Sequence, residues 1–222
     1  MKAVLLDFNG TLFFDSGFHK EAWAKVYREL CGNTDDEPDG NFYCGPRNDV
    51  IIQRIAPWLT SEERDKWSRH KEALYRQSCK ENSELVHLVP GAEELLEYMK
   101  ERRIPFILAS ASIKENIDFY FAQFGLGRWF DKEQCVYDDG SYAHKGEMHL
   151  EAARRLGTTV SECIVVEDSL SSIAHAKENG AGRIVGIGLE SVKNDLLYAG
   201  ADFFIRDFTE FKKEWVTEEI PK

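Results

Sequence analysis

Short apolar runs recur along this chain, and most of them are followed by a segment with the hydrophobic spacing of a helix. Runs of this kind are typical of strands that are buried on both faces of a parallel sheet. The alternation of strand and helix predicts an α/β fold in which helices cover both faces of that sheet. The predicted strands are residues 3–6, 106–109, 163–166, 184–187 and 203–205.

One long segment, residues 16–86, breaks this rhythm and contains no convincing strand. Pro90-Gly91 marks the return to the main domain. We therefore predict a Rossmann-like α/β core formed by residues 1–15 and 87–222, with a helical cap inserted at residues 16–86. The predicted cap helices span residues 19–30, 49–55 and 62–79, and a polar, turn-rich stretch separates the first two at residues 32–45.

Acidic side chains are in excess, and the net charge is −11. An acidic surface disfavours non-specific binding to nucleic acid or to anionic membranes, so we expect neither as a partner. The N-terminal apolar run is too short for a signal peptide or a membrane-spanning helix. The five cysteines are dispersed without CxxC spacing, which fits reduced thiols and a cytoplasmic location. The sequence does not fix the oligomeric state, although a monomer is favoured.

Polar residues follow three of the predicted strands, at the edge where ligands bind in open parallel sheets. The first strand ends in Asp7, the second in Ser110-Ala111-Ser112 and the third in Glu167-Asp168. Lys145 stands in the polar segment before a helix that carries Leu150, Ala153 and Leu156, with Gly157 as its stop. A carboxylate, a hydroxyl, a cation and an acidic pair are thus expected to converge at one edge.

This set of side chains suits phosphoryl transfer. A carboxylate such as Asp7 can attack phosphorus and form an aspartyl-phosphate. Because two anions repel, a divalent cation must bridge them, and hard oxygens from Asp7, Glu167 and Asp168 suit Mg²⁺. Ser110 and its neighbouring backbone amides can donate to the phosphoryl oxygens, and Lys145 can neutralise their charge. Gly10 leaves room for a close approach to the ligand.

The sequence Asp7-Phe8-Asn9-Gly10-Thr11-Leu12 resembles the first motif of the haloacid dehalogenase superfamily, usually DxDGT. Ser110-Ala111-Ser112 resembles the second motif, Lys145 the third and Glu167-Asp168-Ser169 the fourth. The four motifs agree in order and spacing over nearly the whole chain, and the inserted segment resembles the small helical cap called C1. Within the family, the chain is most similar to the branch of beta-phosphoglucomutases and phosphoglycolate phosphatases.

The resemblance implies further site residues. Mg²⁺ is expected at Asp7, the backbone carbonyl of Asn9 and Asp168. Glu167 is expected either to coordinate the ion directly or to contact the groups that coordinate it. Asp7, Asn9 and Lys145 fall at the catalytic positions. Gly10, Ser110, Ala111 and Lys145 fall at positions that bind the phosphoryl group. In the cap, His19, Arg47 and Lys71 fall near substrate-binding positions, with Arg47 offered to a distal phosphate and Lys71 matched across a one-residue gap.

Two segments depart from the family pattern. After Lys145, the usual Pro-x-Pro-Asp is replaced by Gly146-Glu147-Met148-His149. The second aspartate of DxDGT is Asn9 here. In the family, that aspartate protonates the leaving oxygen and then activates water, whereas an amide cannot exchange a proton near neutral pH. Binding of metal and phosphate is therefore expected to persist, while turnover is expected to be slow.

Each of these residues also has a simpler interpretation. Asp7 could stabilise a turn, and Ser110, Asp168 or Ser169 could cap a helix. Lys145 and Arg47 could be solvated surface charges, Trp23 could belong to the core, and His19 could lack any role. The agreement of the four motifs favours the site over these interpretations in the core, whereas His19 and Arg47 stay evenly balanced.

We predict an Mg²⁺-dependent phosphatase that acts on a small phosphorylated metabolite, such as a sugar phosphate. Three alternatives stay open: a phosphomutase of the beta-phosphoglucomutase type, a dehalogenase-like hydrolase, and a protein that binds phosphorylated ligands after losing catalysis. The pair Glu167-Asp168 argues against a dehalogenase, which has little use for a full magnesium site.

Overall fold

The computed structural model describes residues 3–32, 38, 40–43 and 47–217. It contains two compact units, Met1–Phe14 with His87–Lys222 and Asp15–Val86. The first unit is built on a six-stranded sheet of order β3-β2-β1-β4-β5-β6, in which every neighbouring pair is parallel. The predicted α/β class is therefore confirmed. The strands are β1 (Ala3–Leu6), β2 (Phe106–Ile113), β3 (Val136–Asp138), β4 (Cys163–Glu167), β5 (Arg183–Ile187) and β6 (Phe203–Ile205).

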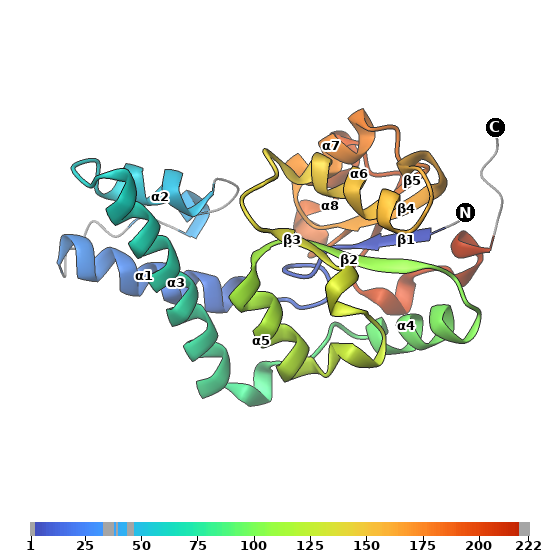
Figure 1. The fold of residues 1–222 in the computed structure, drawn as a ribbon, viewed down its shortest axis with the longest axis horizontal. Helices are drawn as coiled ribbons and strands as arrows, with labels where there is room; N and C mark the ends of the chain where they lie inside the picture. The colour runs from blue at the N-terminus through green and yellow to red at the C-terminus, as the bar shows by residue number, and fades with distance from the viewer. Residues whose placement is uncertain (1–2, 33–37, 39, 44–46, 218–222) are drawn as a thin grey trace. The chain divides into compact units, whose positions relative to one another are not determined.

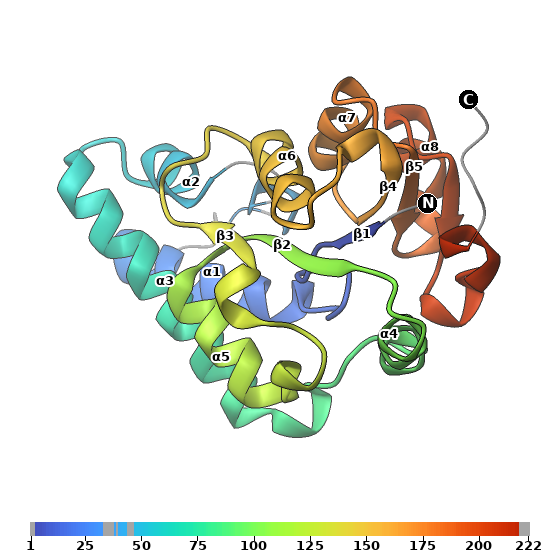
Figure 2. The same ribbon diagram turned by 45° about the vertical axis from the view of Figure 1, so that its right-hand side comes forward.

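Helices cover both faces of the sheet (Figures 1 and 2). Helices α6, α7 and α8 lie on one face, and α4 and α5 lie on the other. The face under α6, α7 and α8 holds an apolar core in which Leu5, Ile107 and Val165 pack against helical Met148 and Ile173. The helices are α4 (Ala92–Glu101), α5 (Lys114–Phe124), α6 (Lys145–Arg155), α7 (Leu170–Glu178) and α8 (Lys193–Ala199).

The order of the strands reverses at the centre of the sheet. The chain proceeds from β1 outward through β2 and β3, and then crosses to β4 on the other side of β1. In such sheets the crevice outside the carboxyl ends of the strands, at the reversal, is the usual place for a ligand. The residue that follows β1, Asp7, lies at this point, because Leu6 pairs with Leu108 on one side and Val166 on the other.

Two predictions in the core were wrong in detail. Strand β3 was not predicted, because three residues with one buried position carry too little of the strand pattern. Lys145 was placed before its helix, but it is the first residue of α6. The predicted stop at Gly157 fits, since α6 ends at Arg155 and Gly157 follows with a φ of +69°.

The second unit is helical, with α1 (Ser16–Cys31), α2 (Asn48–Ile55) and α3 (Ser61–Glu81). Each helix begins one to three residues earlier than the sequence predicted. Thr60 and Glu63 form a capping box that fixes the start of α3. The unit has its own apolar core, which contains Trp23, Val26, Tyr43, Ile51, Ile52, Ile55 and Ala56.

Within the described residues, no helix combines the length and the apolar character needed to cross a bilayer. The four cysteines in this part of the chain, Cys31, Cys79, Cys135 and Cys163, are free thiols.

Candidate active site

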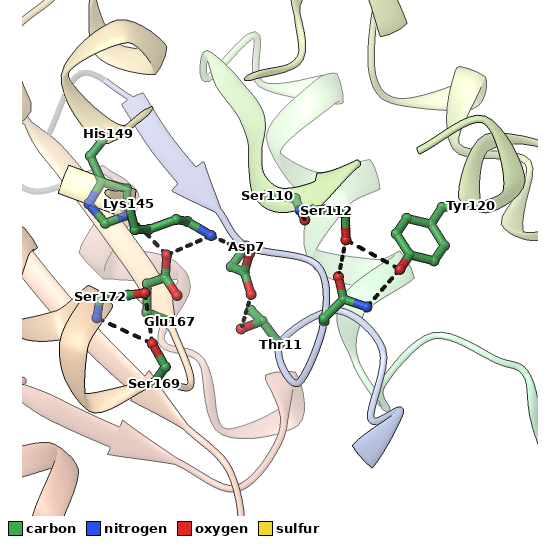
Figure 3. A network of polar contacts seen from close by, with 11 residues as sticks. Asp7, Thr11, Ser110, Ser112, Tyr120, Lys145, His149, Glu167, Ser169 and Ser172 are labelled. Atoms are coloured by element: carbon green, nitrogen blue, oxygen red, sulfur yellow. Dashed lines mark hydrogen bonds and ion pairs between the residues drawn. The ribbon is translucent and has the colours of Figure 1, made fainter. Parts of the chain in front are cut away.

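Asp7 lies in a buried cluster of ionisable side chains that we call the charged cluster: Asp7, Lys145, His149 and Glu167 (Figure 3). The Nζ atom of Lys145 donates to Oδ1 of Asp7 and lies 3.2 Å from Oε1 of Glu167. Nε2 of His149 lies 2.9 Å from the same Oε1 atom. The hydroxyl of Thr11 lies 3.5 Å from Oδ2 of Asp7. One amine therefore links the carboxylates that end β1 and β4.

Local structure explains why these groups meet. Asp7 and Glu167 are the terminal polar residues of two adjacent parallel strands, and the backbone amide of Asp7 donates to the carbonyl of Val166 at 3.2 Å. Lys145 and His149 are four residues apart on α6, so they share one face of the helix. Helix α6 packs over β1 and β2. The sheet supplies the acids and the helix supplies the nitrogen donors.

Burial perturbs the ionisation of the cluster. Burial raises the pKa of Asp7 to about 7, and the negative charge of Glu167 adds to this effect although Lys145 opposes it. Burial also acts to raise the pKa of Glu167, but Lys145 and His149 outweigh it and hold that pKa below its ordinary value. For Lys145, burial acts to lower the pKa, but Asp7 and Glu167 raise it overall. The lysine is thus charged, and Asp7 is the acid that gains most from a further cation.

Three acidic residues here could hold a metal ion. Asp7, Glu167 and Asp168 each offer a ligand atom, and these atoms lie within 4.8 Å of one another. Lys145 supplies one positive charge against three carboxylates, so the donor set has an excess of negative charge. Carboxylate oxygens are hard ligands, and Mg²⁺ is usually bound by one or two carboxylates together with water and substrate phosphate. The chemistry of this group therefore fits Mg²⁺.

Gly10 brings the loop after β1 against Asp168. A Cβ atom at Gly10 would lie 2.0 Å from Oδ2 of Asp168, and the residue has a φ of +70°. Both observations exclude a larger side chain. From the sequence, we expected the missing side chain at Gly10 to leave space for a ligand. In the structure, the Asp168 carboxylate lies in that space. Gly10 thereby lets the first and fourth motifs meet at close range.

A second, uncharged network lies on the other side of the same loop. Nδ2 of Asn9 donates to the hydroxyl of Tyr120 at 2.7 Å, and the hydroxyl of Ser112 donates to Oδ1 of Asn9 at 2.6 Å. The two hydroxyls lie 3.3 Å apart (Figure 3). When Tyr120 donates to Ser112, the hydrogen bonds form a closed ring. We call Asn9, Ser112 and Tyr120 the neutral ring.

The amide of Asn9 suits this ring because it donates and accepts at once. Its partner Tyr120, on α5, is fully buried and stacks on Phe8 with ring centroids 4.1 Å apart. The aromatic stack fixes the tyrosine, and the tyrosine in turn fixes the asparagine. The side chain at the family's acid–base position is therefore held by β2 and α5.

The other site residues that were predicted in the α/β core lie on β2 and at the start of α7. Ser110 is fully buried within β2, and its hydroxyl accepts from the backbone amide of Ser112 at 3.3 Å. Ala111, between them, is exposed. Ser169 is the residue that caps α7, since its side chain accepts from the backbone amide of Ser172. Capping of α7 thus uses Ser169, so it does not account for Glu167, which ends β4.

The predicted cap residues belong to the helical unit. Nζ of Lys71 lies 2.7 Å from Nδ1 of His19 and 2.8 Å from Oε1 of Glu72, with the ring of Trp23 at 5.3 Å. Lys71 is only 2% exposed. His19 and Lys71 are therefore brought together inside this unit.

Arg47, by contrast, has a side chain that is 64% exposed and lies 3.4 Å from Asp49. Residues 33–37, 39 and 44–46, which lie in and just after the predicted polar stretch, are outside the described residues. The contact of His19, Arg47 and Lys71 with a substrate stays a prediction.

Two residues of the site were not identified from the sequence. His149 was visible only as part of a departure from the family pattern. Tyr120 lies on a helix far along the chain from Asn9, and no spacing rule connects them. A partial signal for Tyr120 was the general expectation that helices cover both faces of the sheet.

Comparisons with known proteins agree with this geometry. Residues 1–180 match the sequence pattern of the haloacid dehalogenase-like hydrolases. The chain is 26% identical over 208 residues to a phosphorylated carbohydrates phosphatase from Thermotoga maritima. The aligned region covers 90% of this chain and 92% of the relative.

Solved structures also resemble the chain. The crystal structure of a HAD hydrolase of family IA, variant 3, from Entamoeba histolytica superposes with a TM-score of 0.90 at 32% identity, covering 97% of each chain. A beta-phosphoglucomutase from Clostridium difficile shares the fold, with a TM-score of 0.78 at 22% identity over 98% of this chain and 96% of the other. The family predicted from the four motifs is thus confirmed, and the chain is a member of the haloacid dehalogenase-like hydrolases.

Proposed function

We propose that the chain is an Mg²⁺-dependent phosphatase that hydrolyses a small phosphorylated metabolite through an aspartyl-phosphate on Asp7. The observation that carries this proposal is the charged cluster with Asp168, in which three carboxylates and one lysine converge at the strand reversal. The similarity to a phosphatase for phosphorylated carbohydrates supports the same class of substrate.

In the first step, a carboxylate oxygen of Asp7 forms a bond to phosphorus while the bond from phosphorus to the substrate oxygen breaks. Lys145 is held at Asp7 by Glu167, so its charge lies where the transferring oxygens gather. When bound at Asp7, Glu167 and Asp168, Mg²⁺ would supply positive charge that offsets the repulsion between the carboxylate and the phosphoryl group. Ser110 and the backbone at Ala111 are the proposed donors to the phosphoryl oxygens.

In the second step, water attacks phosphorus, inorganic phosphate leaves, and Asp7 is regenerated. Both steps need a proton: the leaving oxygen takes one, and the attacking water gives one up. The side chain of Asn9 has no carboxyl group that could act as a general acid or base, and its amide is hydrogen-bonded to Ser112 and Tyr120. The protons must then move through water, and a slow turnover is expected.

A phosphatase screen over sugar phosphates, nucleotides and phosphoglycolate, with and without Mg²⁺, tests the proposal. We expect hydrolysis that depends on Mg²⁺ and a phosphoryl group that can be trapped on Asp7 and found by peptide mass spectrometry. Asp7→Asn is the matched control, because it keeps the shape of the side chain. Hydrolysis by a folded Asp7→Asn protein at the wild-type rate would contradict the mechanism.

The amide at position 9 favours one alternative, a protein that binds or captures the phosphoryl group without turning it over. Its signature would be one phosphoryl group per chain on Asp7, formed in a burst and then retained. A steady release of phosphate after the burst would exclude this alternative.

A further inference from the structure

We propose that His149 is a positioning residue that fixes the carboxylate of Glu167 and so prepares the Mg²⁺ site. This inference rests on the proposed function only in that Mg²⁺ is the ion held at Asp7, Glu167 and Asp168. It gives a role to one of the two segments in which the sequence departs from its family.

The contact is short and fully enclosed. His149 is 1% exposed, and its Nε2 lies 2.9 Å from Oε1 of Glu167. Nζ of Lys145 lies 3.2 Å from the same oxygen. Two nitrogen atoms thus converge on Oε1 of Glu167. A carboxylate with one oxygen held in this way cannot rotate freely away from the site.

The surroundings of the other ring nitrogen indicate which tautomer to expect. Within the described residues, Nδ1 of His149 is buried and has no hydrogen-bond partner. A proton on Nδ1 would be a buried donor without an acceptor, which is costly. If the ring carries a single proton, that proton is expected on Nε2, where Glu167 can accept it. The polar capacity of this buried ring is directed at one carboxylate oxygen, as expected for a residue that orients a metal ligand.

The structure also gives a local reason for the sequence of this segment. An aspartate at position 149, as in the usual family pattern, would place a carboxylate beside that of Glu167 if its surroundings stayed the same. Histidine supplies a donor instead. At Gly146, a Cβ atom would lie 3.0 Å from Nδ1 of His144 and from Cβ of His175, whose rings stack 4.3 Å apart. A side chain at position 146 would therefore crowd the stacked rings of His144 and His175.

Isothermal titration of the whole protein with Mg²⁺, in the absence of substrate, tests the inference. Loss of a partner that orients a metal ligand typically weakens metal affinity about 10- to 100-fold. We expect a loss of this size in His149→Ala. His149→Gln should recover most of the affinity, because the glutamine amide can place an N–H near the position of Nε2. His175→Gln is the matched control, since Nδ1 of His175 is also buried without a partner in the described residues.

A second measurement covers the case in which His149→Ala fails to fold. Side-chain ¹⁵N spectra of the metal-free wild-type protein should show His149 with its proton on Nε2, and Glu167→Gln should shift that signal. A proton on Nδ1, wild-type Mg²⁺ affinity in His149→Ala, or equal losses in the Ala and Gln variants would overturn the inference, as would a wild-type protein that binds no Mg²⁺. Absence of phosphatase activity with the expected Mg²⁺ affinities would instead overturn the proposed function alone.

Discussion

The charged cluster and the neutral ring lie on two sides of one loop and differ in how their polar groups are satisfied. Asp7 faces α6 and β4, where carboxylates outnumber cations and burial raises the pKa of Asp7. Asn9, two residues later, faces β2 and α5, where hydroxyls and an amide satisfy one another without any charge. Under the proposed function, the side chains that bind the phosphoryl group and the position that would move a proton therefore belong to separate parts of the fold.

The largest effect is expected from removing the nucleophile on the charged side. Asp7→Asn should lower phosphatase activity by about 10⁴- to 10⁶-fold, the scale seen when a nucleophile or its essential partner is lost. Circular dichroism should show an intact fold, because the substitution is nearly isosteric. Measurement of kcat on the best substrate decides the matter, and a small loss would mean that the charged cluster is not where the chemistry occurs.

The next largest effect should come from introducing an acid–base group into the neutral ring. Asn9→Asp should raise kcat by about 10²- to 10⁴-fold, the usual contribution of a positioned acid–base group. Asn9→Ala breaks the ring without adding an acid and should bring no gain.

Because Asn9 precedes Gly10, the mass of the peptide must first exclude spontaneous deamidation in the wild-type protein. If the fully amidated protein is already fast and Asn9→Asp adds nothing, another group supplies the proton, and His19 is the first candidate to test. A lower activity in Asn9→Asp would favour a reaction other than phosphate hydrolysis.

Gly10, between the two networks, allows a sharper test of how closely the loop must approach Asp168. Gly10→Ala should weaken Mg²⁺ binding more than tenfold, because the new methyl group would overlap the Asp168 carboxylate. Gly140→Ala is the matched control: Gly140 has a φ of +85°, but no atom lies within 4 Å of the position that a Cβ would take there. The control should lower the melting temperature by a few degrees through backbone strain, at about 1–2 kcal/mol, and leave Mg²⁺ binding unchanged. Equal Mg²⁺ affinities in both variants would contradict the assignment.

The smallest expected effect concerns pH and the stability of the metal-free protein. Folding raises the pKa of Asp7 from 3.8 to about 7, so the folded state binds this proton more tightly than the unfolded state. Its contribution to stability is fully present below about pH 4 and is lost as the pH rises through about 7. Asp7→Asn should therefore raise the melting temperature more at pH 8 than at pH 4, by a few degrees for each kcal/mol. Thermal unfolding without Mg²⁺ at both values checks this, and the reverse order would contradict the charge excess inferred for the cluster.

Much of the fold and the charged cluster could be predicted from the sequence. Strand-sized apolar runs indicate the sheet, and each run delivers its next polar residue to the same edge, so Asp7 and Glu167 were identified without coordinates. Strand β3 was too short to leave a pattern. Tyr120 could not be predicted, because its contact with Asn9 depends on how α5 packs over β2. The tautomer of His149 depends on the burial of both ring nitrogens, which no local pattern encodes.

The contact between Gly10 and Asp168 also has a consequence for how this protein matures on the ribosome. Domains generally begin to fold from the N-terminus during synthesis. The loop that carries Asp7 and Gly10 is made first, but the Asp168 carboxylate that packs against it is made only after β2, β3 and α6. A nascent chain that stops before Asp168 carries Asp7 without its complete ion site. Under the proposed function, tight Mg²⁺ binding therefore requires a chain in which β1 to β4 have all been synthesised.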